Sequence, residues 1–236
     1  MISKRVVRDV VLRSVGLEWS ARPPTLVRHG EWAVGNVLEL AIAYALAQRR
    51  ELTVIQVGAF TGGSADPLRA LVRKYHLQGI VVEPEPRAFA VLTQVYADTP
   101  HMKPVNVAVA ESEGVRTLYS FAGKHIPQSS LHRSHLLRYG VAARDIQGFD
   151  VRCVTLVTLM QEHGLQRCDV LQIDAEAHDY AIVRSIDFEV CAPLVIRFEH
   201  QHMSKRQQNE CVERLAARGY RFLVERNDLT ALRYDA

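Results

Sequence analysis

Apolar residues along most of this chain follow two alternating patterns, one typical of strands and one typical of helices. Short apolar runs of strand length are separated by segments in which apolar residues recur every three or four positions. The runs predict strands at residues 53–57, 79–83, 104–109, 169–174 and 194–199. The segments between and after them predict helices at residues 66–76, 86–97, 177–186 and 204–218. Strands that alternate with helices predict a mostly parallel sheet with helices on both faces.

Two more strand patterns lie near the end of the chain. Residues 220–226 and 229–234 flank Asn227 and Asp228, a pair of turn-forming residues, and therefore predict a β-hairpin. The hairpin adds an antiparallel partner to the sheet. The expected fold class is therefore α/β: a Rossmann-like, doubly wound fold with a mostly parallel seven-stranded sheet and a C-terminal antiparallel hairpin.

The first fifty residues differ from the rest. Apolar residues keep a helical spacing between Val6 and Val15, and a second helical pattern covers residues 36–50. We interpret residues 1–50 as an N-terminal helical cap or extension, packed beside a main domain that covers residues 51–236.

The segment that follows the third predicted strand is the least regular part of the main domain. Residues 115–121 alternate between apolar and polar like an extra strand, and residues 151–164 carry either a short strand or a helix. Between them, residues 123–148 are rich in polar side chains, and we expect them to form a mobile excursion.

A glycine-bearing turn follows the first predicted strand and precedes a helix. Gly58, Gly62 and Gly63 allow the backbone to approach a ligand closely, and the amides at the start of the helix would point into the same crevice. The second strand ends in Glu83, whose carboxylate can accept hydrogen bonds from both hydroxyls of a ribose. The turn and the acid together predict a nucleotide-type site.

Polar residues and turns collect at one end of the predicted strands. Strands one, two, four and five end in Gly58, Glu83, Asp174 and Glu199. Ligands of open α/β sheets bind at the carboxyl ends of the strands. We therefore expect the functional site at this edge of the sheet.

Composition and charge exclude several classes of protein. The formal net charge of +3 is too small to demand a nucleic-acid partner, and no apolar run approaches the length of a membrane span. The first residues include no apolar segment of signal-peptide length, and the four cysteines lack metal-binding or redox spacing. We expect a cytoplasmic protein with buried free thiols and with neither a nucleic-acid nor a membrane partner.

Four motifs give the chain a resemblance to class I methyltransferases that use S-adenosylmethionine, and more narrowly to the FkbM family. That family has a glycine turn V-G-A-x-x-G, an E-P pair after strand two, a stretch similar to I-D-x-E-G-x-E after strand four, and a later strand that ends in Glu after a Pro. The matching segments are residues 57–62, 83–84, 173–176 and 193–199. The resemblance covers about residues 53 to 234.

The chain departs from the family pattern at three positions. Gln56 replaces the acid usual on strand one, although an amide oxygen can still accept a hydrogen bond from the amino group of the methionine part. Phe60 replaces the Asn of the turn, and Ala177 replaces the glycine expected after Glu176.

The resemblance implies where S-adenosylmethionine binds. Its methionine half would lie over the glycine turn, its ribose on Glu83, and its adenine near Asn106 and the two residues after it. The implied cofactor-binding residues are Gln56, Gly58, Ala59, Phe60, Gly62, Ser64, Glu83, Pro84, Asn106, Val107, Ala108, Ser129 and Asp174.

Asp174, Glu199 and His200 follow two strands that should be neighbours, so they are candidate ligands of a divalent metal ion such as Mg²⁺. Metal-dependent O-methyltransferases place acidic ligands at similar strand ends. The alternative is that Asp174 orients the cofactor or the substrate, and that Glu199 only pairs with an arginine.

The candidate catalytic residues are His178, Asp174 and His200. His178 lies four residues past Asp174, and an imidazole titrates near neutral pH, so His178 is the candidate general base, with His202 as a second candidate. Because His200 and His202 alternate in an extended segment, we expect them to point to opposite sides.

The resemblance implies an S-adenosylmethionine-dependent O-methyltransferase that acts on a hydroxyl of a small molecule, such as a sugar or a secondary metabolite. The cap helices offer a surface for homo-oligomer formation. Two alternatives stay open. An NAD(P)-dependent oxidoreductase could use a similar sheet, although its Tyr-x-x-x-Lys pair is not matched by Tyr119 and Lys124. A non-catalytic cofactor-binding member of the fold is favoured by Gln56 and Ala177.

Overall fold

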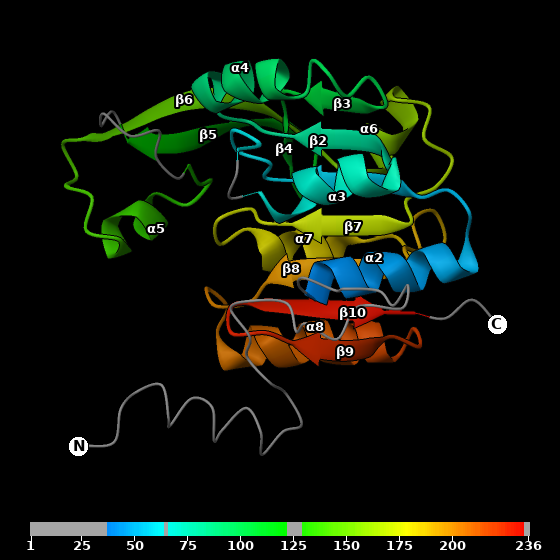
Figure 1. Ribbon diagram of the computed structural model, residues 1–236. Helices are drawn as coiled ribbons and strands as arrows, with labels where there is room; N and C mark the ends of the chain where they lie inside the picture. Colours follow the sequence, from blue (N-terminus) through cyan, green and yellow to red (C-terminus); the bar gives the residue numbers. More distant parts are fainter. Residues whose placement is uncertain (1–36, 64–65, 122–128, 234–236) are drawn as a thin grey trace, which may run out of the picture. The chain divides into compact units, whose positions relative to one another are not determined.

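The computed structural model describes residues 37–63, 66–121 and 129–233, and the main compact unit begins at Val37. Its centre is a seven-stranded sheet with the order β3-β2-β1-β7-β8-β10-β9 (Figure 1). The parallel strands at its core are β1 (Thr53–Val57), β2 (Gln78–Val82), β3 (Met102–Val105), β7 (Val170–Ile173) and β8 (Val195–Glu199). The predicted fold class is therefore confirmed.

The C-terminal hairpin is also confirmed. Strand β10 (Asp228–Leu232) inserts between β8 and β9 (Arg221–Val224) and pairs antiparallel with both of them. Both strands that the hairpin pattern predicted are therefore part of the large sheet.

Helices cover both faces of the sheet, because the central strands are apolar on both sides. All five residues of β1 are buried, as expected for a strand whose two faces are both covered. One face packs in a single apolar cluster with α2 (Val37–Gln48), α3 (Pro67–Tyr75) and α4 (Pro86–Val95). The other face packs with α6 (Leu156–Glu162), α7 (Asp179–Ser185) and α8 (Lys205–Ala216).

Local sequence signals fix where these helices begin. Asp66 caps α3 by accepting a hydrogen bond from the backbone N–H of Leu68 at 2.9 Å, with a proline at the first helical position. Glu85 caps α4 by accepting a hydrogen bond from the backbone N–H of Ala88 at 2.6 Å, again followed by a proline. Both helices therefore begin directly after the turns that follow β1 and β2.

A second, three-stranded sheet has the strand order β4-β6-β5. It comprises β4 (Ala108–Val109), β5 (Gly114–Phe121) and β6 (Ile146–Val154), and α5 (Arg133–Arg138) lies in the connection between β5 and β6. The extra strand predicted at residues 115–121 is β5 and is confirmed.

Two expectations for this region were wrong. The strand predicted at residues 104–109 divides into β3, which belongs to the large sheet, and β4, which belongs to the second sheet. Between them, Nδ2 of Asn106 donates to the carbonyl oxygens of Glu83 and Pro84 at 2.8 and 3.1 Å. The irregular excursion predicted at residues 123–148 contains α5 and the start of β6 in its described part, where β6 pairs with β5 along its length. Its mobility stays a prediction.

The N-terminal cap is described only in part. The helix predicted near residues 36–50 is α2, and it contacts β8, β10 and α3 within the same compact unit as the sheet. The helical pattern between Val6 and Val15 lies outside the described residues, so the role of residues 1–50 as a cap stays a prediction.

The expectations about membrane spans and about the cysteines can be compared with the structure. In the part of the chain that the structure describes, no helix combines the length and the apolar character needed to cross a bilayer. All four cysteines fall within that part, and they are buried and free of disulfides, as predicted: Cys153, Cys168, Cys191 and Cys211.

The turn between β7 and α7 holds two non-glycine residues in the left-handed region of backbone space. Glu176 has φ of 46° and Ala177 has φ of 78°. A side chain in this region costs about 1–2 kcal/mol, because its Cβ approaches the following carbonyl oxygen. The FkbM pattern has glycine where this chain has Ala177, so the chain keeps the turn but carries the strain.

Replacing Ala177 by glycine should therefore stabilise the protein. The relief of strain exceeds the extra chain entropy of glycine by about 0.5–1 kcal/mol, which corresponds to a rise of about 2 °C in the unfolding midpoint. Thermal unfolding of the ligand-free protein measures this change in the unfolding midpoint. The matched control is Ala175→Gly, which relieves no positive φ and should lower the midpoint. Equal changes of the unfolding midpoint in the two variants would contradict the claim that Ala177 is strained.

Candidate active site

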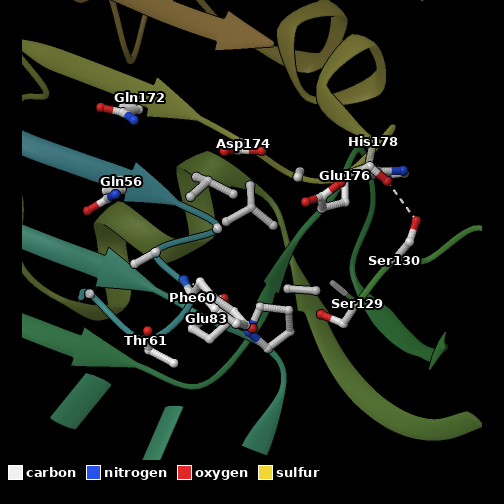
Figure 2. Close-up of a pocket in the computed structure, with 18 of the residues that line it drawn as sticks. Gln56, Phe60, Thr61, Glu83, Ser129, Ser130, Gln172, Asp174, Glu176 and His178 are labelled. Atoms are coloured by element: carbon white, nitrogen blue, oxygen red, sulfur yellow. Dashed lines mark hydrogen bonds between the residues drawn. The ribbon is translucent and has the colours of Figure 1, made fainter. Parts of the chain in front are cut away.

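A cavity of about 540 Å³ opens at the carboxyl ends of β1, β2 and β7 (Figure 2). Strand β1 lies between β2 and β7 in the sheet. From β1 the chain adds β2 and β3 on one side and β7 and β8 on the other, and ligands of such folds bind where the strand order changes direction in this way. The volume of the cavity is in the range of small-molecule sites. The residues that line it are Gln56, Val57, Gly58, Ala59, Phe60, Thr61, Gly62, Gly63, Asp66, Pro67, Glu83, Pro84, Val107, Ala108, Val109, Leu118, Ser129, Ser130, Leu131, Gln172, Asp174, Ala175, Glu176 and His178.

Gly58 allows the turn after β1 to touch the end of β7. Its φ is +79°, and a Cβ at this position would lie 1.8 Å from the carbonyl oxygen of Asp174, which is main chain and cannot yield. The backbone N–H groups of Gly58 and Ala59 both donate to the carbonyl oxygen of Val82 at 2.9 Å. The turn is thus fixed to β7 on one side and to β2 on the other.

Glu83 lies at the end of β2 and holds the turn from the opposite direction. Its carboxylate accepts hydrogen bonds from the backbone N–H of Phe60 at 2.8 Å and of Glu85 at 2.9 Å. Burial, with the carboxyls of Glu85 and Asp174 nearby, raises the pKa of Glu83 to about 7, although the two N–H groups lower it. Each carboxylate oxygen has a further lone pair, so the group can still accept two hydroxyl donors from a ligand.

The floor of the cavity carries two buried amides on neighbouring strands. Gln56 of β1 and Gln172 of β7 are partners in the parallel register, and both line the cavity (Figure 2). Nε2 of Gln56 donates to Oδ1 of Asp66 at 3.0 Å. Within the described residues, neither amide oxygen accepts a hydrogen bond. Buried acceptors without partners are costly, so this floor suits a ligand that carries N–H donors, such as an ammonium group. Nothing in the sequence pattern had indicated Gln172.

Other predicted cofactor residues take different positions around the cavity. Val107, Ala108 and Ser129 line it, whereas Asn106 only pins the turn after β2. Phe60 lines it, is 39% exposed and has φ of +49°, a conformation in which a bulky residue is rare. The remaining predicted residue, Ser64, lies outside the described residues.

Asp174 faces the cavity directly after β7 (Figure 2). Burial, with the carboxyls of Glu176 and Glu199 nearby, raises the pKa of Asp174 to about 7. A buried acid in such surroundings favours a cationic ligand, because a positive charge would stabilise its ionised form.

His178 forms the middle of a hydrogen-bonded chain at the cavity wall. Its Nε2 lies 2.9 Å from Oε2 of Glu111, and its Nδ1 lies 3.1 Å from Nε2 of His132. Burial lowers the pKa of both imidazoles below 6.5, so both are mainly neutral at pH 7. Burial tends to raise the pKa of Glu111, but its bond to Arg116 and the neighbouring groups lower it to about 2.

These contacts fix the proton positions in the chain of Glu111, His178 and His132. Because the carboxylate only accepts, Nε2 of His178 donates to Glu111, and Nδ1 of His178 accepts from Nε2–H of His132. Nδ1 of His132 is then the acceptor at the exposed end of the chain. Sequence reasoning selected His178 but missed Glu111 and His132, which belong to the region of the second sheet.

The predicted metal set of Asp174, Glu199 and His200 is not brought together. His200 points away: its Nε2 lies 3.3 Å from the carbonyl oxygen of Glu225, and it does not line the cavity. Glu199 pairs with no arginine in the described residues; Oε2 of Glu199 lies 3.0 Å from Nε2 of His202. The two histidines face different groups, as predicted, but the extended segment expected at residues 200–202 is absent. The chain turns after β8, where the backbone N–H of Met203 donates to the carbonyl oxygen of His200 at 3.1 Å.

Ser130 fastens the segment that covers the cavity. Its Oγ donates to the carbonyl oxygen of Glu176 at 2.7 Å, the dashed contact in Figure 2, and accepts a hydrogen bond from the backbone N–H of His132 at 3.0 Å. The same residue forms a bridge with Tyr119 of β5. The second sheet therefore positions the histidine chain against the turn after β7.

Comparisons with solved structures give distant likenesses. A methyltransferase FkbM from Methylobacillus flagellatus is 9% identical with a TM-score of 0.49, and the match covers 77% of this chain and 43% of that longer one. The N-terminal domain of human METTL16, in complex with SAH, is 13% identical with a TM-score of 0.47, and the match covers 98% of this chain and 82% of that one. A precorrin-6y C5,15-methyltransferase from Geobacter metallireducens is 12% identical with a TM-score of 0.41, over 81% and 86% of the two chains.

A protein-family model matches most of the chain. No curated protein sequence matches the chain. The model of the methyltransferase FkbM domain matches residues 56–222, which include the glycine turn, Glu83, Asp174 and the strand that ends in Glu199. The chain therefore belongs to the family of FkbM methyltransferase domains, whose members depend on S-adenosylmethionine.

Proposed function

We propose that the protein transfers the methyl group of S-adenosylmethionine to a hydroxyl of a small molecule. The observation that carries this proposal is the arrangement of the cavity wall. A carboxylate with free acceptor capacity, Glu83, lies at the end of β2, and the chain of Glu111, His178 and His132 lies at the end of β7 and the second sheet. One side fits a ribose and the other can take a proton.

The residues of the cavity fit this cofactor in three ways. Gly58 has no side chain, so the cofactor can approach the backbone of the turn closely at this position. Glu83 has lone pairs for two ribose hydroxyls. The unpaired amide oxygens of Gln56 and Gln172 suit the ammonium group of the methionine part. When bound, the cofactor supplies an electrophilic methyl group, and the chain supplies alignment and a proton acceptor.

The histidine chain gives the proton of a hydroxyl a place to go. A hydroxyl attacks efficiently only when a base removes its proton in the transition state. Nδ1 of His132 can accept that proton, and Nε2–H of the same ring can pass one to Nδ1 of His178. The imidazolium formed at His178 is then stabilised by the carboxylate of Glu111 at 2.9 Å. In this proposal His178, which lines the cavity, relays the proton, and the acceptor hydroxyl meets Nδ1 of His132, which is exposed and lies outside the residues that line the cavity.

The acceptor is proposed by class alone. A sugar or a secondary metabolite fits the family resemblance, and the cavity wall made by Ser129, Ser130 and Leu131 is where such a molecule would approach. Location in the cytoplasm, homo-oligomer formation and the lack of nucleic-acid partners stay predictions.

The two rival functions make different demands on the same cavity. An oxidoreductase would bind a nicotinamide dinucleotide there, and a non-catalytic member would bind S-adenosylmethionine without turnover. Calorimetric titration with S-adenosylmethionine, S-adenosylhomocysteine and NAD⁺, followed by a screen of hydroxylated acceptors with labelled cofactor, separates the three. Micromolar binding of the first two ligands and transfer of label to an acceptor oxygen support the proposal. Binding of NAD⁺ alone would overturn it.

Glu83→Gln should weaken binding of S-adenosylmethionine at least about tenfold. The amide keeps one acceptor oxygen but loses the charge that strengthens hydrogen bonds from ribose hydroxyls. Its NH2 also replaces an oxygen that accepts from the backbone N–H of Phe60 or Glu85. The matched control is Glu85→Gln, which makes the same change at a buried helix cap that does not line the cavity. Calorimetry on both variants measures the effect, and equal affinities would remove Glu83 from the ribose site.

Glu111→Gln should lower the pKa of His178 further below 6.5. The carboxylate raises this pKa against the larger effect of burial, so its loss favours the neutral ring. In the unchanged protein, the rate of methyl transfer should increase with pH as the histidines lose their protons. In Glu111→Gln this increase should occur at lower pH, and the maximal rate should be at least about tenfold lower.

Titration of the histidine ring signals by NMR measures the pKa without an acceptor. Glu113→Gln is the matched control, because Glu113 is exposed and contacts Thr158 rather than a histidine. An unchanged His178 titration in Glu111→Gln would show that the carboxylate does not act on the ring in solution.

A further inference from the structure

Three potential metal ligands from distant parts of the chain meet at the same edge of the sheet. His135 of α5, Glu176 of the turn after β7 and His202 after β8 each offer one ligand atom, and these atoms lie within 4.8 Å of one another. They are not the residues that the sequence pattern had selected. Among the described residues, these three side chains form the group of potential metal ligands that lie close enough to share an ion.

The contacts of this cluster converge on one point. Nε2 of His135 lies 2.9 Å from Oε2 of Glu176, and Nε2 of His202 lies 3.0 Å from Oε2 of Glu199. The two imidazole rings meet edge to face with their centroids 4.7 Å apart. Tyr139 closes the cluster, because its hydroxyl lies 3.1 Å from Nε2 of His202. His135, Glu176 and His202 therefore form one group, and Glu199 adjoins it through His202.

His135 is the most informative member, because it is fully buried. Its Nδ1 accepts or donates no hydrogen bond within the described residues, and its Nε2 faces only the carboxylate of Glu176. A buried histidine that serves packing alone normally satisfies both ring nitrogens. Here, within the described residues, the buried ring of His135 has one hydrogen-bonding partner, Glu176, whose side chain belongs to the wall of the cavity.

We propose that His135, Glu176 and His202, with Glu199 as a fourth ligand, bind a divalent transition-metal ion. Imidazole nitrogens suit Zn²⁺, Fe²⁺ and Ni²⁺, whereas Mg²⁺ prefers oxygen ligands throughout. Ligand atoms of a tetrahedral zinc site stand about 2.0–2.2 Å from the ion, so the ligand atoms of His135, Glu176 and His202, which lie within 4.8 Å of one another, need only small side-chain adjustments to reach one ion.

The position of the ion gives it a role that rests on the proposed function. Glu176 lines the cavity, whereas His135, His202 and Glu199 do not, so an ion held by these residues would lie at the cavity wall beside Glu176. A hydroxyl bound to such an ion loses its proton more readily than a free one. The ion would thus hold and activate the acceptor next to the histidine chain. Binding of the ion itself does not depend on that role.

The test measures metal binding on the full chain, without cofactor or acceptor. Protein stripped with a chelator is titrated with Zn²⁺ against a coloured competitor chelator, with Mg²⁺ in parallel, and Co²⁺ serves as an absorbing probe of the ligand geometry. The proposal expects one Zn²⁺ per chain, at least about a hundredfold preference over Mg²⁺, and a Co²⁺ spectrum of four or five ligands.

Variants show which residues hold the ion. His202→Ala is used because His202 is only partly buried, so the fold should survive, and zinc affinity should fall at least about tenfold. His200→Ala is the matched control, since His200 faces Glu225 instead, and its zinc affinity should equal that of the unchanged protein. Glu176→Gln should behave like His202→Ala. Equal zinc binding by His202→Ala and the unchanged protein, or no zinc binding at all, would overturn the proposal.

Titration of the same samples with S-adenosylmethionine keeps the two proposals apart. Cofactor binding without zinc binding would overturn the metal site and leave the proposed methyl transfer standing. Zinc binding that His202→Ala weakens, without cofactor binding, would support the metal site and contradict the proposed function.

Discussion

The contact between the turn after β1 and the end of β7 is the constraint on which the rest of the site depends. A Cβ at residue 58 would lie 1.8 Å from the carbonyl oxygen of Asp174, so the two strand ends can meet only around glycine. That contact sets the distance between Glu83, which holds the turn through Phe60, and the residues that follow β7. The cavity is therefore shaped by main chain, and ligand-binding side chains are added around a rigid frame.

Around this frame the chain keeps polar groups that its own structure leaves poorly compensated. Burial raises the pKa of both Glu83 and Asp174 to about 7. Within the described residues, the amide oxygens of Gln56 and Gln172 accept no hydrogen bond. Such groups lower stability unless a ligand pairs with them. A cofactor with a sulfonium, an ammonium and two ribose hydroxyls supplies the partners that these acceptors lack.

Sequence reasoning succeeded where local pattern decides the outcome. The run 53–57 became β1 at the predicted bounds, and the placement of Glu83 and Asp174 at strand ends followed from strand length alone. It failed where side chains meet through tertiary structure. His132 reaches His178 only because the second sheet and Ser130 bring its segment over β7. A polar stretch without periodicity gives no signal of such pairing, which arises from contacts 46 residues apart.

The central claim is that the cavity at this edge of the sheet holds S-adenosylmethionine in one orientation. A crystal structure of the protein with S-adenosylhomocysteine tests it most directly. The account predicts the ribose hydroxyls on the carboxylate of Glu83, the amino group at Gln56 and Gln172, and the sulfur directed toward Asp174. Product bound elsewhere, or bound in the cavity with its ribose away from Glu83, would contradict the account.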